Sequence, residues 1–330
     1  MKLTTIEAKL KRVGLDRYLM ILFLTVLLAA FFPARGEFAT ILASVTFWAV
    51  ALLFFLYGAK LSVAATLAGL TNWKLQLGCM LCTYALFPVL ALGLFGITQA
   101  WIPAAVGIGF LYLGCLPSTV QSSIAFTSVA GGNVAGAICA ASLSNIIGVV
   151  LCPLLLAVML NASNGAADPL AAIWKIAQQI LLPFVLGQIA RPWLSGLINR
   201  YKQPTMLVDR GSILLIVYSA FSAGVVAGIW QLLSWTDISL LIALCAVLLG
   251  VAMAIVETSG RASGMPREDR LALLYCGSTK SLATGLPMAG ILFDHAEVAL
   301  IILPLMLYHL IQLTALAVLS QRSAAATPAE

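Results

Sequence analysis

Apolar runs of about 20 residues recur from one end of the chain to the other, and each is long enough to cross a bilayer as one helix. Only 9% of the 330 residues are charged, against about 25% in an ordinary soluble domain, which argues against a soluble helical bundle. The sequence therefore predicts an all-α polytopic membrane protein. We expect ten spans, at about 16–33, 38–58, 74–97, 103–130, 133–160, 169–191, 209–232, 236–257, 269–293 and 297–320.

The basic residues indicate how the spans are oriented. If the N-terminus is cytoplasmic, all but three of the 18 lysines and arginines fall on the cytoplasmic side, where membrane proteins concentrate positive charge. The exceptions are Arg35 outside, Lys175 near the outer end of a span and Lys280 within the membrane. We therefore expect a multi-pass protein of the inner (plasma) membrane with both termini cytoplasmic. Segment 1–15 is then a cytoplasmic N-terminal segment, and 323–330 is a disordered cytoplasmic tail.

Two spans are interrupted by small and polar residues at corresponding places in the two halves of the chain. The interruptions are 115–124 (CLPSTVQSSI) in span four and 275–287 (YCGSTKSLATGLP) in span nine. The halves, 16–160 and 169–320, each hold five spans, and because five is odd the second half is inverted relative to the first. In a bilayer, non-helical backbone is tolerated only where protein buries it or where it lines a cavity. Paired interruptions therefore predict a transporter's binding site near the midplane.

Lys280 is the basic residue that we expect nearest to the middle of the membrane. An ammonium there costs roughly 3 kcal/mol or more, so it needs a partner, a wet cavity or the loss of its proton. It pairs with an anionic substrate, serves as a permanent cation in a vacated metal-ion site, or carries a proton. In a purely structural alternative, it donates to unwound backbone carbonyls near Pro117–Ser123. No carboxylate is expected deep in the membrane, so a proton relay through aspartate or glutamate has no obvious residue.

Hydroxyl and amide side chains cluster around the two interruptions and suit helix capping and ligand contact equally well. They are Ser118, Thr119, Gln121, Ser122, Ser123, Ser278, Thr279 and Ser281. Side chains in neighbouring spans face the same cavity or pack helix against helix. These are Thr83, Ser142, Ser144 and Asn145. His309 and Gln312 lie on one face of span ten, where they bind substrate or form an interhelical hydrogen bond.

At these residues the sequence resembles the bile acid–sodium symporter family, in its SBF-like bacterial branch. The resemblance covers nearly the whole chain and is best at 115–135, 264–266 and 308–309. It implies two inverted five-helix repeats that form a six-helix core domain, in which helices four and nine cross at their breaks, and a four-helix panel domain. It also implies an alternating-access carrier for organic anions, bile acids among them, with the substrate bound between panel and core.

The chain departs from this family at most of the positions that the resemblance assigns to sodium ligands. Those positions fall on Thr83, Ser122, Ser123, Ala137, Ala141, Cys276 and Lys280. Cys276 replaces a glutamate shared by both sodium sites, and Lys280 replaces a glutamine. Our hypothesis is that the Lys280 ammonium stands in for a bound sodium ion, so that transport is sodium-independent or proton-coupled. If sodium does bind, we expect it near Ser122, Ser123, Thr83 and Thr279.

The sequence thus predicts a secondary transporter of a small organic or bile-acid-like anion in a lipid bilayer. It contains no phosphate-binding loop, catalytic triad or zinc motif, so we expect no enzymatic activity, no cofactor, no confident metal site and no nucleic-acid partner. The alternative is a non-transporting membrane regulator or scaffold that keeps the transporter fold. Saturable uptake by the reconstituted protein distinguishes the two.

Overall fold

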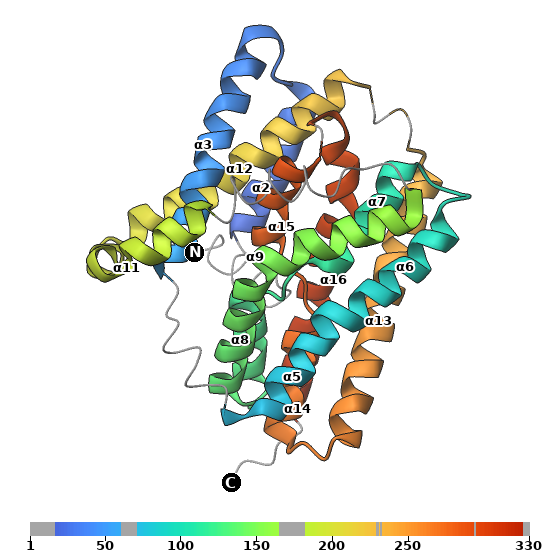
Figure 1. Ribbon diagram of the computed structural model, residues 1–330. Helices are drawn as coiled ribbons and strands as arrows, with labels where there is room; N and C mark the ends of the chain where they lie inside the picture. The colour runs from blue at the N-terminus through green and yellow to red at the C-terminus, as the bar shows by residue number, and fades with distance from the viewer. Residues whose placement is uncertain are drawn as a thin grey trace, which may run out of the picture.

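A computed structural model describes residues 17–60, 71–164, 182–228, 231, 233–293 and 295–325, and every regular element among them is a helix (Figure 1). The helices are α2 (Arg17–Phe31), α3 (Gly36–Lys60), α5 (Trp73–Leu81), the π-helical turn η2 (Cys82–Leu86), α6 (Phe87–Thr98), α7 (Ala104–Cys115), α8 (Gln121–Val129), α9 (Val134–Asn164), α11 (Leu182–Arg200), α12 (Lys202–Val226), α13 (Trp235–Ala262), α14 (Arg267–Gly277), α15 (Leu282–Leu292) and α16 (His295–Ala325).

Six helical stretches among the described residues are long and apolar enough to cross a membrane. They are α3, the continuous α5–η2–α6, α9, α12, α13 and α16. The shorter helices α2 and α7 are also apolar. The prediction of an all-α, multi-pass membrane protein is therefore confirmed.

The predicted span boundaries differ most from the structure between spans six and seven. There α11 continues to Arg200 and α12 begins at Lys202, so most of the expected inner loop is helical. Apolar residues four apart, such as Trp193 and Leu197, extend the helical pattern past the predicted end of span six. At the C-terminus, α16 runs to Ala325 and so includes the first three residues of the predicted tail.

Several expectations from the sequence fall on residues outside the described part of the chain. These are the segment 1–15, the first part of span six with Lys175, and the end of the tail at 326–330.

Four helices, α2, α3, α11 and α12, form one group in which α2 packs on α12 and α3 packs on both α11 and α12. The backbones of α3 and α11 approach closely where Gly58 meets Gly187. A Cβ atom on Gly58 would lie 2.0 Å from the carbonyl oxygen of Phe184, and one on Gly187 would lie 2.0 Å from that of Phe55. Small residues at a crossing of this kind allow membrane helices to pack backbone to backbone.

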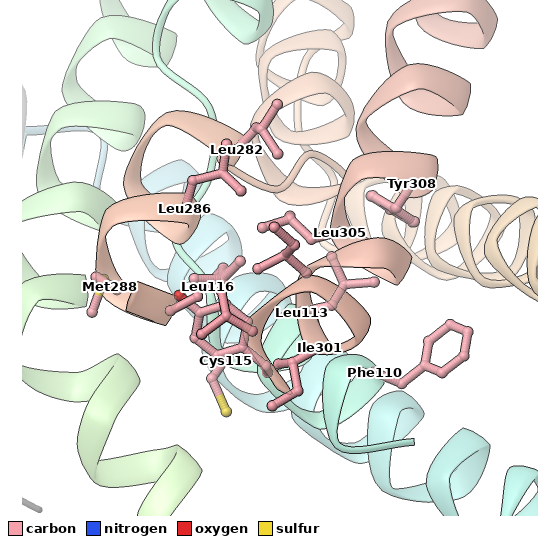
Figure 2. Close-up of a cluster of buried hydrophobic side chains, with 14 of the residues drawn as sticks. Phe110, Leu113, Cys115, Leu116, Leu282, Leu286, Met288, Ile301, Leu305 and Tyr308 are labelled. Carbon is pink, nitrogen blue, oxygen red and sulfur yellow. The ribbon is translucent and has the colours of Figure 1, made fainter. Parts of the chain in front are cut away.

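The remaining helices form a second group around a large apolar core. Figure 2 shows the centre of this core, where Leu113 and Leu116 at the end of α7 face Leu286 of α15 and Leu305 of α16. All four of these side chains are buried. The two groups meet where α12 packs against α15 and α16. The broken helices α7–α8 and α14–α15 both belong to the second group.

Candidate functional site

The two interruptions lie directly against each other. The first is the non-helical segment 116–120 between α7 and α8, and the second is 278–281 between α14 and α15. The backbone N–H of Ser281 donates to the carbonyl of Pro117 at 2.9 Å. The Ser118 hydroxyl donates to the carbonyl of Cys276 at 2.6 Å and lies 3.0 Å from the hydroxyl of Thr279. Two segments about 160 residues apart in the sequence therefore form one polar contact inside the apolar group.

Local sequence explains why both helices break at these places. Pro117 has no N–H to continue α7, and a proline disfavours helical backbone at the residue before it. Leu116 is accordingly extended, with φ −69° and ψ 150°. In the second interruption, Ser281 is the N-cap of α15, and its hydroxyl accepts the N–H of Thr284 at 3.2 Å. A serine cap of this type starts a new helix from an extended residue.

Lys280 is fully buried at the centre of this contact. Its Nζ atom donates to the backbone carbonyls of Thr83 at 3.0 Å, Gly114 at 2.9 Å and Leu116 at 2.7 Å. The same nitrogen lies 4.2 Å from the ring centroid of Phe87, within the range of a cation–π interaction. An ammonium has three N–H donors, so these three carbonyls satisfy it completely.

The Thr83 carbonyl is free to accept from Lys280 because of the π-helical turn η2. In that turn, the N–H of Phe87 donates to the carbonyl of Cys82. The next N–H in the same register would come from Pro88, which has none. The Thr83 carbonyl therefore has no partner within its own helix, and the Lys280 ammonium donates to it instead.

The other two carbonyls belong to the end of α7. The last carbonyls of a helix lack partners within it, and the negative end of the helix dipole favours a cation there. The N–H of Ser118, which would serve the Gly114 carbonyl in a continuous helix, donates instead to the Ser144 hydroxyl at 3.0 Å. Lys280 therefore acts as a C-terminal cap for α7, supplied by the other half of the chain.

Hydroxyl groups form a chain beside the lysine. Ser122 donates to the Thr119 hydroxyl at 2.7 Å, Thr119 donates to the Thr279 hydroxyl at 3.1 Å, and Thr279 donates to the Tyr275 carbonyl at 2.9 Å. Of these side chains, Ser122 is the one that is partly exposed. The chain thus leads from an accessible face of α8 into the buried contact.

Neighbouring helices hold the interruptions in place. The amide of Asn145 donates to the Ser118 carbonyl at 2.8 Å and accepts from the Thr284 hydroxyl at 2.9 Å. Gln312 binds both backbone groups of Lys280 at 2.9 Å, accepting its N–H and donating to its carbonyl. His309 reaches this site through Gln312, whose Nε2 atom lies 2.8 Å from its ring nitrogen Nδ1.

The side chains of some predicted site residues take no part in this contact. The hydroxyls of Ser123 and Ser278 bond only to carbonyls of their own segments. Gln121 is exposed on α8. Thr83 contributes its carbonyl, while its buried hydroxyl has no hydrogen-bond partner. The thiol of Cys276 lies 3.7 Å from the carbonyl of Ala137, so two positions that the resemblance assigns to sodium ligands adjoin without a side-chain oxygen.

The sequence analysis named backbone carbonyls near Pro117–Ser123 as the structural alternative for Lys280, and the Gly114 and Leu116 carbonyls that accept from it lie just before that segment. It missed the Thr83 carbonyl and several of the groups that support the site. The Leu-Pro pair at 116–117 was a readable signal for a broken helix with free carbonyls, but a carbonyl itself has no signature in a sequence. Tyr308 was also missed as a donor, although its hydroxyl binds the carbonyl of Ser278 at 2.7 Å. The same holds for Tyr84, whose hydroxyl donates to the Ser144 carbonyl at 2.5 Å.

A cavity of about 620 Å³ lies between the two helix groups. Its walls come from α3, α11 and α12 on one side, and from Gly290, Ile291 and Val298 of α15 and α16 on the other. None of the described residues that line it is charged. One of its few polar groups is the Thr46 hydroxyl, which is buried without a hydrogen-bond partner. A pocket of this size and character suits the apolar body of a drug-sized molecule.

Comparisons of the sequence with a family pattern and with individual proteins agree with one another. The sequence pattern of the SBF-like CPA transporter family matches residues 16–325. An uncharacterized protein of Pseudomonas aeruginosa is 45% identical over 309 residues, 94% of this chain and 93% of its own. A protein of Escherichia coli (strain K12), provisionally named symporter YfeH, is 44% identical over 313 residues, 93% and 92% of the two chains. Sodium/bile acid cotransporter 7 of Rattus norvegicus is 30% identical over 274 residues, 81% and 79% of the two chains.

Proposed function

The chain belongs to the SBF-like CPA transporter family, and on this premise we propose that it carries a small bile-acid-like organic anion across a membrane by alternating access. Membership confirms the resemblance seen in the sequence, and it makes the protein a transporter rather than an enzyme. The observation that carries the proposal is the contact between two broken helices around the buried Lys280. Such helix ends near the midplane are where secondary transporters bind their substrates and coupling ions.

The proposal includes ten spans in two inverted repeats, 16–160 and 169–320, with both termini in the cytoplasm. The pairing of helices supports it. Span one (α2) packs on span seven (α12), and span six (α11) packs on span two (α3). An inverted repeat relates span one to span six and span two to span seven. The contact between spans one and seven therefore corresponds, in the repeat, to the contact between spans six and two. In this arrangement α2, α3, α11 and α12 are the panel, and the second helix group is the core.

We place the apolar body of the substrate in the cavity between panel and core. The name of the rat relative points to bile acids, which are amphipathic anions with a large apolar body. The lining of the cavity matches such a body but offers no cation for the anionic group. We therefore expect that group to lie outside the cavity. We also expect the bound molecule to shift the side chains that cover the buried Thr46 hydroxyl and to bond to it through a polar substituent.

We further propose that transport is sodium-independent because Lys280 already fills a cation site. Three backbone carbonyls and an aromatic face surround its ammonium as they would surround a small cation. At the equivalent family positions, Cys276 and Ala137 supply no oxygen ligand from their side chains. If Lys280 instead gives up its proton during transport, the carrier is proton-coupled, and uptake then responds to a pH gradient.

The test is uptake of radiolabelled taurocholate, and of a panel of smaller organic anions, by proteoliposomes that contain the full chain. Saturable uptake that is equal in sodium and choline buffers, and that does not respond to a pH gradient, is the expected result. Uptake that requires sodium would contradict the substitution of an ion by Lys280, and uptake driven by a pH gradient would show proton coupling. Absence of both uptake and ligand-induced thermal stabilisation across the panel would favour the scaffold alternative.

A further inference from the structure

The carboxylate of Asp269 joins the starts of three helices. It is buried in the first turn of α14. One of its oxygens accepts the side-chain amide N–H of Asn72, and the other accepts that of Asn133, both at 2.7 Å. Each asparagine also caps its own helix, since Asn72 accepts the N–H of Leu75 at 3.4 Å and Asn133 accepts that of Gly136 at 2.8 Å. A single carboxylate thus links the N-terminal ends of α5, α9 and α14.

Backbone contacts reinforce the link between α9 and α14. The N–H of Asn133 donates to the carbonyl of Glu268 at 2.9 Å. A Cβ atom on Gly132 would lie 3.0 Å from the Cβ of Leu271 and 3.2 Å from the Glu268 carbonyl oxygen, so the turn before α9 fits closely onto α14. Because the N-terminus of a helix carries partial positive charge, three helix starts around one carboxylate attract it.

The segments that begin at these three helix starts each deliver a group to the contact at Lys280, at the same distance along the sequence. Thr83 lies eleven positions after Asn72, Ser144 eleven positions after Asn133, and Lys280 eleven positions after Asp269. The segment from Asn133 to Ser144 is α-helical and, at about 1.5 Å per residue, rises roughly 16 Å, about half of a hydrocarbon core of about 30 Å. The other two segments include the π-helical turn η2 and the break after Gly277. Figure 1 shows α5 and α14 starting at the same end of the molecule. Three segments tied together at Asp269 therefore meet again at the crossover.

We propose that Asp269 is a positioning residue for the crossover. By fixing the first residues of α5, α9 and α14 at one level, it sets the register at which Lys280 meets the Thr83 carbonyl and at which Ser144 meets the N–H of Ser118. This role goes beyond the proposed function, because it concerns how the site is assembled and needs no identified substrate.

The substitution Asp269→Asn tests this role with little change in shape. The amide oxygen of the new asparagine accepts from only one of the two amides, those of Asn72 and Asn133. Its own N–H donors then face the N–H donors of the other. Adding Asn133→Asp restores the network, because the new carboxylate accepts from the new amide as well as from the N–H of Gly136. The double variant keeps the net charge of the wild type. Glu268→Gln is the matched control, since it removes one acid from the same turn of α14 at an exposed position.

The measurement is hydrogen–deuterium exchange, by mass spectrometry, of the full-length protein in lipid nanodiscs. At the crossover, the N–H of Lys280 is bonded to Gln312 and that of Ser281 to Pro117. In Asp269→Asn we expect amides at 278–281 to exchange at least threefold faster than in the wild type. In the double variant and in Glu268→Gln we expect the rates of the wild type.

Faster exchange confined to the helix starts, with 278–281 unchanged, would reduce Asp269 to a local cap and overturn the proposal. Crossover exchange in the double variant as fast as in the single variant would do the same. If Asp269→Asn does not fold, Asn133→Ala removes one of the two ties and keeps the other. Faster exchange at 116–120 and 278–281 is then expected, and exchange confined to 133–137 would again overturn the proposal.

Discussion

The side-chain nitrogen of Lys280 lies 2.7 Å from the carbonyl oxygen of Leu116, so the end of α7 is capped by a residue 164 positions later in the chain. This one contact explains both interruptions, because α7 needs an external donor after Pro117 and Lys280 needs acceptors in an apolar core. Each break leaves buried polar groups, and the other break pairs some of them: Lys280 caps the end of α7, and the N–H of Ser281 bonds to Pro117. The two halves of the chain therefore stabilise each other's broken helix.

Replacing Lys280 by methionine should destabilise the protein strongly. The side chain keeps its approximate length, but three buried carbonyls lose their donor. An unpaired buried acceptor costs about 1–3 kcal/mol, partly offset because no ammonium is desolvated. We expect a net loss of about 3 kcal/mol in the free energy of unfolding. Thermal unfolding in nanodiscs measures it, with the exposed Lys74→Met as control, and equal stability of both variants would mean that water replaces the lysine.

Replacing Lys280 by alanine should create a response to sodium that the wild type lacks. The shorter side chain leaves the carbonyls of Thr83, Gly114 and Leu116 facing an open space the size of a small cation. A cation that binds only the folded state raises its stability by mass action. We expect that replacing choline chloride by sodium chloride in the buffer raises the melting temperature of Lys280→Ala and leaves that of the wild type unchanged. Stabilisation of the wild type by sodium would contradict this assignment of Lys280.

The sequence contains enough information for the fold class and the family, and for the two interruptions. Apolar length defines the membrane spans, and Pro117 marks the end of α7 through the loss of one donor. The cost of burying an ammonium singles out Lys280 from the sequence alone. These features depend on single residues or on local composition, which a sequence displays directly.

Other features depend on backbone geometry or on distant partners, and the sequence alone did not reveal them. The free carbonyl of Thr83 requires the π-helical turn, which sets the register relative to Pro88. Asp269 stands at the predicted start of span nine, where the sequence gives no sign of burial, yet Asn72 and Asn133 bury it by pairing with both of its oxygens. The extension of α11 to Arg200 was missed because a span was assumed to end at the membrane boundary.

Gly187→Ala should disrupt the packing of α3 on α11, whereas Gly196→Ala on the same helix should not. A Cβ atom at Gly187 would lie 2.0 Å from the Phe55 carbonyl oxygen, a contact that requires the two backbones to separate. At Gly196 nothing lies within 4 Å, and alanine is the better helix former by about 1 kcal/mol. We expect a clear loss of thermal stability in the first variant and none in the second. Equal stability of the two would mean that the helices pack less closely than described.

Thr46→Val should weaken ligand binding without loss of stability. The Thr46 hydroxyl is buried and unpaired, so its replacement by a methyl group removes a polar group that contributes nothing in the empty protein. A ligand that bonds to this hydroxyl would lose about 1 kcal/mol, or roughly fivefold in affinity. Ligand-induced thermal stabilisation, with an organic anion that stabilises the wild type, measures the change.

The matched control for this variant is Thr25→Val on α2, where the hydroxyl donates to the Ile21 carbonyl on an exposed face. It should leave ligand affinity unchanged. Ala220→Trp, which fills the same cavity from α12, should abolish the response to the ligand. If the ligand stabilises the Ala220→Trp variant as well as it does the wild type, its apolar body binds elsewhere, and the cavity between the helix groups is then a packing gap rather than a substrate site.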